Sequence, residues 1–218
     1  MDQKLSFDVD CRLCPRLSEF LDEVGEEYPD YHARPVAPFG AKNPDLLIVG
    51  LAPGMHGANA TGRPFTGDYA GVLLYETLHH FGYGNRPESV SADDGLKLKG
   101  CRITNAVKCL PPQNKPLTSE VVACSPYLQN ELNGLKKGAV VMALGGVAHN
   151  AVLRALGLKA SQHKFGHNNR YPLEGDRWLL DSYHCSRYNT QTRRLTPEMF
   201  RDVFASADEL LGKKGRKR

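Results

Sequence analysis

The sequence predicts an α/β fold in which helices cover both faces of a parallel sheet. Short apolar runs, typical of buried parallel strands, recur at 45–51, 101–108, 139–144 and 177–183. Helical patterns separate these runs, at 70–82, 119–136 and 147–157. Because parallel neighbours need a crossover connection, usually a helix, this alternation indicates a parallel sheet.

The totals limit what kind of protein this is. The chain has 218 residues, enough for a substantial core, and we expect residues 1–218 to form a single domain. A net charge of +4 and a pI of about 8.7 are compatible with a polyanionic partner. The sequence contains no run of 18 apolar residues and no signal-peptide core. We therefore expect a cytoplasmic protein with no membrane partner, and a monomer.

The chain begins with an N-terminal segment, residues 1–40, that holds a Cys-x2-Cys pair, a helical pattern to about residue 30 and a linker. The first strand then leads into a Gly/Pro-rich stretch, 50–71, at the sheet edge where open α/β sheets bind ligands. Long loops in compact domains are usually functional, although an ordinary surface loop remains the alternative. No Gly-Lys-Ser/Thr closes the stretch, which excludes a Walker A loop.

Pro, Gly and capping residues divide the rest of the chain. Residues 84–99 are predicted to be irregular, and the Pro-rich loop LPPQNKP follows the second strand. Thr118 is predicted to N-cap the next helix. After a polar loop, HCSRYNTQTRRL, Thr196-Pro197 is predicted to start a terminal helix, and a basic tail, 212–218, ends the chain.

Side chains suited to binding and chemistry are expected together at one edge of the sheet. The glycine-rich stretch carries a titratable ring, an amide, a cation, an aromatic face and a carboxylate: His56, Asn59, Arg63, Phe65 and Asp68. Asn105 near the end of the second strand and His184 beyond the fourth are expected at the same edge. A stacking ring, an edge-reading amide and a polar basic loop are what an enzyme needs to extrude a nucleotide and act on its base.

Four of the six cysteines are candidate metal ligands, because thiols in a reducing compartment rarely form disulfides. Cys11 and Cys14 form the C-x2-C pair, and Cys109 and Cys124 flank the Pro-rich loop. Four thiolates can bind one Zn²⁺ or an iron–sulfur cluster, and the spacing does not separate these two sites. Buried thiols without a ligand are the third alternative.

The segments GLAPGMHGANATGRPFTGD and HCSRYNTQTRRLT resemble the two signature motifs of family five uracil-DNA glycosylases, the iron–sulfur branch of the uracil-DNA glycosylase superfamily. The resemblance includes the four cysteines and the KCLPPQNKP segment, and it runs from about residue 11 to 205. It implies a three-layer α/β/α sandwich with a central four-stranded parallel sheet. It also implies hydrolysis of the N-glycosidic bond of uracil, hypoxanthine or xanthine in DNA.

The resemblance also implies roles for individual residues. Asp68 would hold or activate water or stabilise the positive sugar, and His184 would donate a hydrogen bond to the departing base. Residues expected to contact the base are Leu51, Ala52, His56, Phe65, Asn105 and Asn114. Residues expected to contact DNA are Arg63, Ser186, Arg187, Tyr188, Asn189, Gln191 and Arg193. Cys11, Cys14, Cys109 and Cys124 would bind a structural 4Fe-4S cluster that ties the N-terminal segment to the domain.

Three residues depart from the family pattern. Ala60 stands where an arginine is expected, and Arg193 where a glycine is expected. Asn105 stands where family five members often have alanine, and its amide could pair with the uracil edge and narrow the pocket. We therefore expect this protein to favour uracil over purine bases more than its relatives do. The alternatives are a damaged-base DNA-binding protein without turnover and a zinc-stabilised nucleic-acid-binding module.

Overall fold

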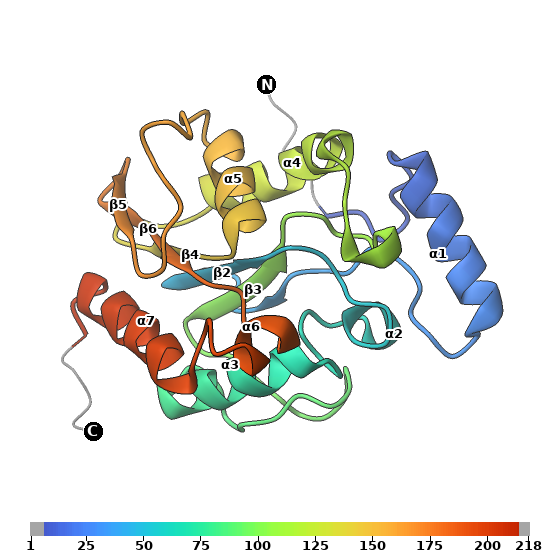
Figure 1. The fold of residues 1–218 in the computed structure, drawn as a ribbon, viewed down its shortest axis with the longest axis horizontal. Helices are drawn as coiled ribbons and strands as arrows, with labels where there is room; N and C mark the ends of the chain where they lie inside the picture. Colours follow the sequence, from blue (N-terminus) through green and yellow to red (C-terminus); the bar gives the residue numbers. More distant parts are fainter. Residues whose placement is uncertain (1–6, 214–218) are drawn as a thin grey trace.

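The computed structural model describes residues 7–213 and has a mixed α/β fold (Figure 1). Its strands are β1 (Phe39–Gly40), β2 (Leu46–Gly50), β3 (Cys101–Asn105), β4 (Val140–Leu144), β5 (Arg170–Leu173) and β6 (Arg177–Ser182). Its α-helices are α1 (Pro15–Glu27), α2 (Ala58–Thr61), α3 (Tyr69–His80), α4 (Thr118–Asn133), α5 (Gly146–Ala155), α6 (Arg187–Gln191) and α7 (Pro197–Leu210). Within this range no helix has the length and apolar character needed to cross a membrane.

The sheet has six strands in the order β1-β3-β2-β4-β6-β5, two more than the sequence predicts. The neighbours β3, β2, β4 and β6 pair in parallel, whereas β1 and β5 pair antiparallel with β3 and β6 at the two edges. The edge strands lack the signal used to find the others. β1 has two residues, and β5 alternates between exposed and half-buried residues, so neither forms a buried apolar run.

Helices cover both faces of the sheet, as expected. Alternate residues of β2 supply the two cores: Leu46 and Ile48 pack in the cluster that includes α3 and α7, and Leu47 and Val49 in the one that includes α4 and α5 (Figure 1). α1 lies at one side of the molecule, apart from both helical layers (Figure 1). It buries its apolar stripe in a third cluster, against Val107 and Leu110 from the segment after β3.

Element positions predicted from the sequence agree with the structure, and the differences lie at the ends. The predicted strand 101–108 stops at Asn105, because the chain leaves the sheet there. Thr118 is the first residue of α4 and not its cap. Leu117 occupies the N-cap position, and its backbone N–H donates a hydrogen bond to the Glu120 carboxylate at 2.7 Å. The predicted loop 184–195 contains α6. The tail beyond residue 213 lies outside the described residues.

The first turn of α3 leaves no room for a side chain at Gly71. A Cβ there would lie 1.8 Å from the carbonyl oxygen of Phe65, so the helix rests directly on the backbone of the glycine-rich stretch. Gly25 in α1 differs, since a Cβ there would meet Ala33 at 3.5 Å, an ordinary contact.

These two glycines should respond to alanine with opposite signs. Gly71→Ala is expected to lower the free energy of unfolding by about 2 kcal/mol or more, as overpacking does. Gly25→Ala is expected to raise it by about 0.5–1 kcal/mol, because alanine loses less entropy in a helix. Urea denaturation measures both. Equal stability of Gly71→Ala and the wild type would show that α3 can move away from Phe65.

Candidate functional site

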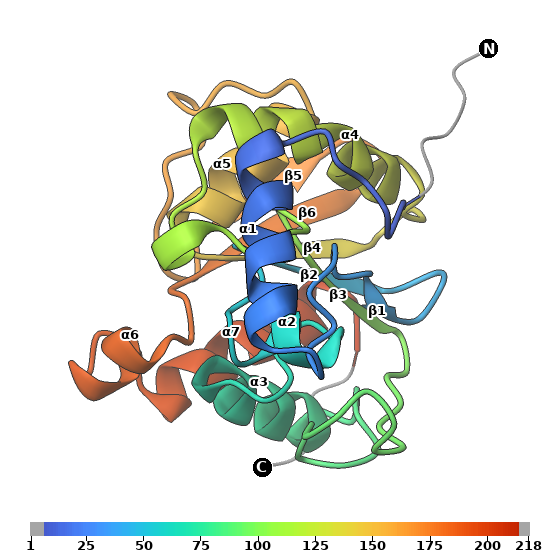
Figure 2. The same ribbon diagram turned by 90° about the vertical axis from the view of Figure 1, so that its right-hand side faces the viewer.

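The parallel strands end where the predicted site residues gather, on the side of the molecule seen in Figure 2. Gly50 at the end of β2 pairs with Asn105 at the end of β3. A Cβ on Gly50 would lie 2.4 Å from Asn105 Oδ1 and 2.6 Å from Phe65 Cζ. The missing side chain therefore lets the amide and the aromatic ring approach the same backbone. Both are buried, and Asn105 Oδ1 has no hydrogen-bond partner among the described residues.

Phe65 and His184 bring the two predicted motifs into contact. Their rings stack with centroids 5.9 Å apart and planes inclined by 28°. Phe65 holds its backbone in the left-handed region, with φ of +57°, which turns the chain so that the ring faces back under β2. Burial lowers the pKa of His184 to about 4, so the imidazole is neutral at neutral pH and keeps one N–H donor.

Asp68 lies at the junction between the glycine-rich stretch and α3. Its Oδ1 accepts the Gly71 N–H at 2.9 Å, which makes it the N-cap of the helix. Its Oδ2 lies over the backbone of Gly57, where an added Cβ would come within 2.8 Å. Burial raises the pKa of Asp68, and the backbone N–H groups of Gly71 and Ala70 offset only part of that effect. A half-buried carboxylate with a raised pKa is characteristic of functional sites.

The second motif forms a short braced helix rather than a loop. Ser186 caps α6 by accepting the Asn189 N–H, and the Asn189 side chain donates to the His184 carbonyl at 2.8 Å. Tyr188 projects from α6 and is 71% exposed. The Arg187 guanidinium lies over the ring of Tyr69, 5.7 Å from its centroid.

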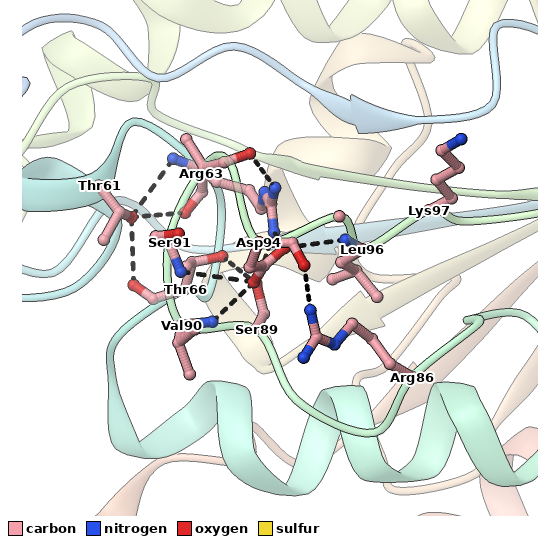
Figure 3. Close-up of polar contacts among 12 residues, drawn as sticks. Thr61, Arg63, Thr66, Arg86, Ser89, Val90, Ser91, Asp94, Leu96 and Lys97 are labelled. Carbon is pink, nitrogen blue, oxygen red and sulfur yellow. Dashed lines mark hydrogen bonds and ion pairs between the residues drawn. The ribbon is translucent and has the colours of Figure 1, made fainter.

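Arg63 is the main correction to the predicted DNA contacts. Its side chain is buried and bonds to Asp94 Oδ1 at 2.8 Å, to Ser89 Oγ at 3.0 Å and to the Ala92 carbonyl (Figure 3). Burial would raise the pKa of Asp94, but the bonds from Arg63 and three backbone N–H groups outweigh it and hold that pKa below its usual range. Arg63 therefore ties the glycine-rich stretch to segment 84–99 and has no exposed face for a phosphate.

The other predicted residues are spread around this centre. His56 is exposed, and its Nδ1 pairs with the Tyr31 hydroxyl at 2.8 Å. Asn114 is exposed and has a φ of +56°. Leu51 and Ala52 are half-buried beyond β2, and Gln191 is exposed at the end of α6. Arg193 is exposed with a φ of +56°, which suits the glycine that the resemblance places there.

Sequence reasoning missed two aromatic residues at this edge. Tyr69 directly follows Asp68 and supports Arg187. Tyr31 supports His56. Tyr69 could have been suspected, because an aromatic residue beside a motif carboxylate is a candidate DNA contact. Tyr31 lies in the linker of the N-terminal segment and carries no pattern that marks it.

The four predicted ligand cysteines line one hollow. It lies between α1, α4 and the segment after β3 and is partly open to solvent. Burial and the neighbouring thiols raise the pKa of Cys109 to about 12, and burial also raises the pKa values of Cys14 and Cys124. The Lys108 backbone N–H points to Cys124 Sγ at 3.3 Å.

The cysteines surround this hollow rather than meeting at a point. Within residues 7–213 no three His, Cys, Asp or Glu side chains converge closely enough to hold a single metal ion. Cys109 and Cys124 are buried, whereas Cys11 and Cys14 are half-buried. The two cysteines from the segment after β3 and from α4 are therefore the enclosed pair, and the two from the N-terminal segment lie nearer to solvent.

Comparison with known proteins gives a consistent match. The sequence matches the family model of the Uracil DNA glycosylase superfamily over residues 37–207. It is 49% identical over 210 residues to the Type-5 uracil-DNA glycosylase of Thermus thermophilus, which covers 93% of this chain and 94% of that protein. It is 44% identical over 210 residues to the Type-5 enzyme of Mycobacterium leprae, with 93% and 92% covered.

A solved structure shares the fold. The crystal structure of wild-type Pedobacter heparinus SMUG2 superposes with a TM-score of 0.53 at 17% identity, over 96% of this chain and 94% of that one. At this identity the similarity describes the arrangement of the helices and strands only.

Proposed function

Because this chain belongs to the uracil-DNA glycosylase superfamily, we propose that it hydrolyses the N-glycosidic bond of uracil in DNA and so begins base-excision repair. The observation that carries the proposal is that Phe65 approaches Gly50 together with Asn105 and stacks on His184, where the parallel strands end. Asp68, three residues after Phe65, caps α3 beside them. We propose a monofunctional glycosylase that uses water, because the segments 50–71 and 184–195 contain no lysine that could act as an amine nucleophile.

The two catalytic groups would act on opposite ends of the breaking bond. Bond cleavage leaves negative charge on the base and positive charge on the sugar. The neutral His184 ring would donate a hydrogen bond to the base carbonyl, where the negative charge develops. The Asp68 carboxylate would hold the attacking water or stabilise the positive sugar.

The base pocket must open before it can be filled. The Phe65 ring is 5% exposed, and His184 covers part of it. A base can therefore stack on Phe65 only after the His184 ring and the ring of Phe65 separate. Asn189 holds the His184 carbonyl, so movement of α6 on DNA would be transmitted to His184.

The DNA would be gripped by the exposed residues of the second motif. Ser186, Asn189 and the exposed side chains Gln191 and Arg193 lie in or just beyond α6. Of the two neighbouring DNA-contact candidates at the start of α6, Arg187 lies over the Tyr69 ring whereas Tyr188 is 71% exposed. Tyr188 is therefore the better candidate to fill the gap left by an extruded nucleotide.

We also propose that the cysteine hollow holds a 4Fe-4S cluster rather than a single zinc ion. Four zinc ligands would have to lie about 2.3 Å from one point, whereas a cluster is held by thiolates spread around it. Cys11, Cys14, Cys109 and Cys124 would bind the cluster, and its chemistry here is structural crosslinking. It would join α1, the segment after β3 and α4, and so support the segment that directly follows Asn105.

Substituting Asp68 separates its two roles. Asp68→Asn should keep the free energy of unfolding within about 0.5 kcal/mol, because Asn is an equally good N-cap, while uracil excision slows by about 10²–10³-fold. Asp68→Ala should slow excision as much and also lose about 1 kcal/mol of stability.

His184→Ala should slow excision by about 10²-fold. Single-turnover cleavage of a uracil oligonucleotide and urea denaturation measure these effects.

Thr196→Ala is the matched control. Thr196 caps α7 through the Met199 N–H at 3.2 Å and takes no part in the site, so this variant should lose stability and keep its rate. A full rate in Asp68→Asn would remove the carboxylate from the mechanism. No excision by the folded wild type would favour the alternative, a DNA-binding protein without turnover.

We also propose that Asn105 biases the pocket towards uracil. Uracil and hypoxanthine present the same N–H and C=O pattern to an amide, so discrimination must come from the space that the side chain fills. Asn105→Ala should lower kcat/KM for uracil about tenfold and leave hypoxanthine excision equal or faster. Matched oligonucleotides with uracil, hypoxanthine or xanthine provide the measurement. Comparable wild-type rates on uracil and hypoxanthine, unchanged in Asn105→Ala, would contradict this role.

The cluster proposal makes a prediction that does not depend on activity. The wild type should be brown, with four iron atoms and four sulfides per chain, and Cys109→Ser should lose colour and unfold at a lower urea concentration. Cys101 is fully buried in the hydrophobic core beneath α3 and α7 and is not a proposed ligand, so Cys101→Ala should keep the colour. One zinc per colourless chain would replace the cluster by a zinc site.

A further inference from the structure

An apolar patch lies beside the catalytic site and is not used by any step above. Tyr69 is 48% exposed and Val72 is 66% exposed, although both are apolar residues on a helix of a compact domain. They are three residues apart on α3 and therefore face the same side. Tyr69 directly follows Asp68, so the patch begins one residue from the proposed catalytic carboxylate.

The patch continues onto α6, which lies beside α3 (Figures 1 and 2). Arg187 stacks on the Tyr69 ring, and the next residue, Tyr188, is the most exposed of the large apolar side chains that the described residues present. The Tyr69 ring, Val72 and the Arg187 guanidinium therefore lie on one surface, and Tyr188 is exposed on the same short helix as Arg187. Single exposed apolar residues are ordinary, but a contiguous group next to an active site indicates a partner.

The cationic group within the patch favours a polyanionic partner. Arg187 lies within it, and the exposed Arg193 lies beyond the end of α6. Exposed Glu76, one turn further along α3, bounds the patch on the far side. Rings that stack on bases next to cations that meet phosphates are the usual arrangement for binding nucleic acid strands.

We propose that Tyr69 and Val72 form, with Arg187, a shelf on α3 that packs against the DNA strand flanking the extruded nucleotide. This inference rests on the proposed function and extends it from the two motifs to a helix that neither motif includes. Tyr69 would stack on a neighbouring base and hold Arg187 towards the phosphates, and Val72 would cover the sugar edge. The shelf and Tyr188 would then contact the DNA on the two sides of the flipped position.

The test measures binding to a duplex that contains a tetrahydrofuran abasic-site analogue, which needs no turnover. Tyr69→Ser should raise the Kd roughly tenfold, the size expected when one base loses its stacking partner. Val72→Ser should raise it about threefold, with an unchanged slope of log Kd against log salt, since no phosphate contact is lost. Tyr69→Phe should bind as the wild type does, because the ring and not the hydroxyl makes the contact.

Val122→Ser is the matched control, because Val122 is a 46% exposed valine on α4, on the other face of the sheet. It should leave the Kd unchanged. The shelf is overturned if Tyr69→Ser and Val72→Ser bind as Val122→Ser does. It is also overturned if the wild type is a dimer that these two variants dissociate, since the patch would then be covered by a second copy.

The outcomes distinguish the shelf from the proposed function. Uracil excision together with unchanged Kd values would remove the shelf and keep the glycosylase. Weaker binding by Tyr69→Ser with no excision of any base by the wild type would keep the shelf and remove the glycosylase.

Discussion

The absence of a side chain at Gly50 is the constraint on which the site depends. β2 and β3 run in parallel and end together, so Asn105 and the turn that carries Phe65 must pass the same point of the backbone. Any Cβ at that point would overlap Asn105 Oδ1 and the Phe65 ring. The same close packing recurs at Gly71, where α3 meets the Phe65 carbonyl. Two glycines thus bring the amide and the ring close to the sheet, and the His184 ring joins this arrangement by stacking on Phe65.

The buried Arg63–Asp94 pair gives this arrangement its outer support. Segment 84–99 has little regular structure, yet Asp94 accepts bonds from Arg63 and from the backbone of its own loop (Figure 3). A buried pair of this kind contributes less through net attraction than through the high cost of leaving either partner alone. It therefore selects one conformation of the glycine-rich stretch, and this is a requirement for a site whose groups must be placed within fractions of an ångström.

The features that follow from apolar periodicity and from the positions of strand ends could be predicted from the sequence. The four parallel strands and the helices between them follow from such patterns, and so does the placing of Asn105, Asp68 and His184 at one edge. The sequence was insufficient where the partner of a side chain is distant. An arginine among glycines has the composition of a phosphate ligand, and only the fold shows that Arg63 meets Asp94, 31 residues further along the chain. The exposure of a side chain is equally difficult to predict from sequence. Tyr69 has the position of an ordinary first residue of an amphipathic helix, and only the fold places Arg187 above its ring.

Two aspartates of this region show how the fold separates support from chemistry. The pKa of Asp94 is lowered in the folded state, so its contribution to stability is present above the pKa of the unfolded chain and is lost as the pH falls through the lower folded value. The pKa of Asp68 is raised in the folded state, so the folded protein binds that proton more tightly than the unfolded chain. The pH dependence of stability at Asp68 is therefore opposite to that at Asp94. The contribution of Asp68 is present at low pH and is lost as the pH rises from its unfolded pKa through its higher folded pKa. Burial disfavours the charged form of the Asp68 carboxyl group, a cost that an uncharged capping side chain would not carry. Ser186 and Thr196 cap their helices with hydroxyl groups, so capping alone does not require a carboxyl group at Asp68.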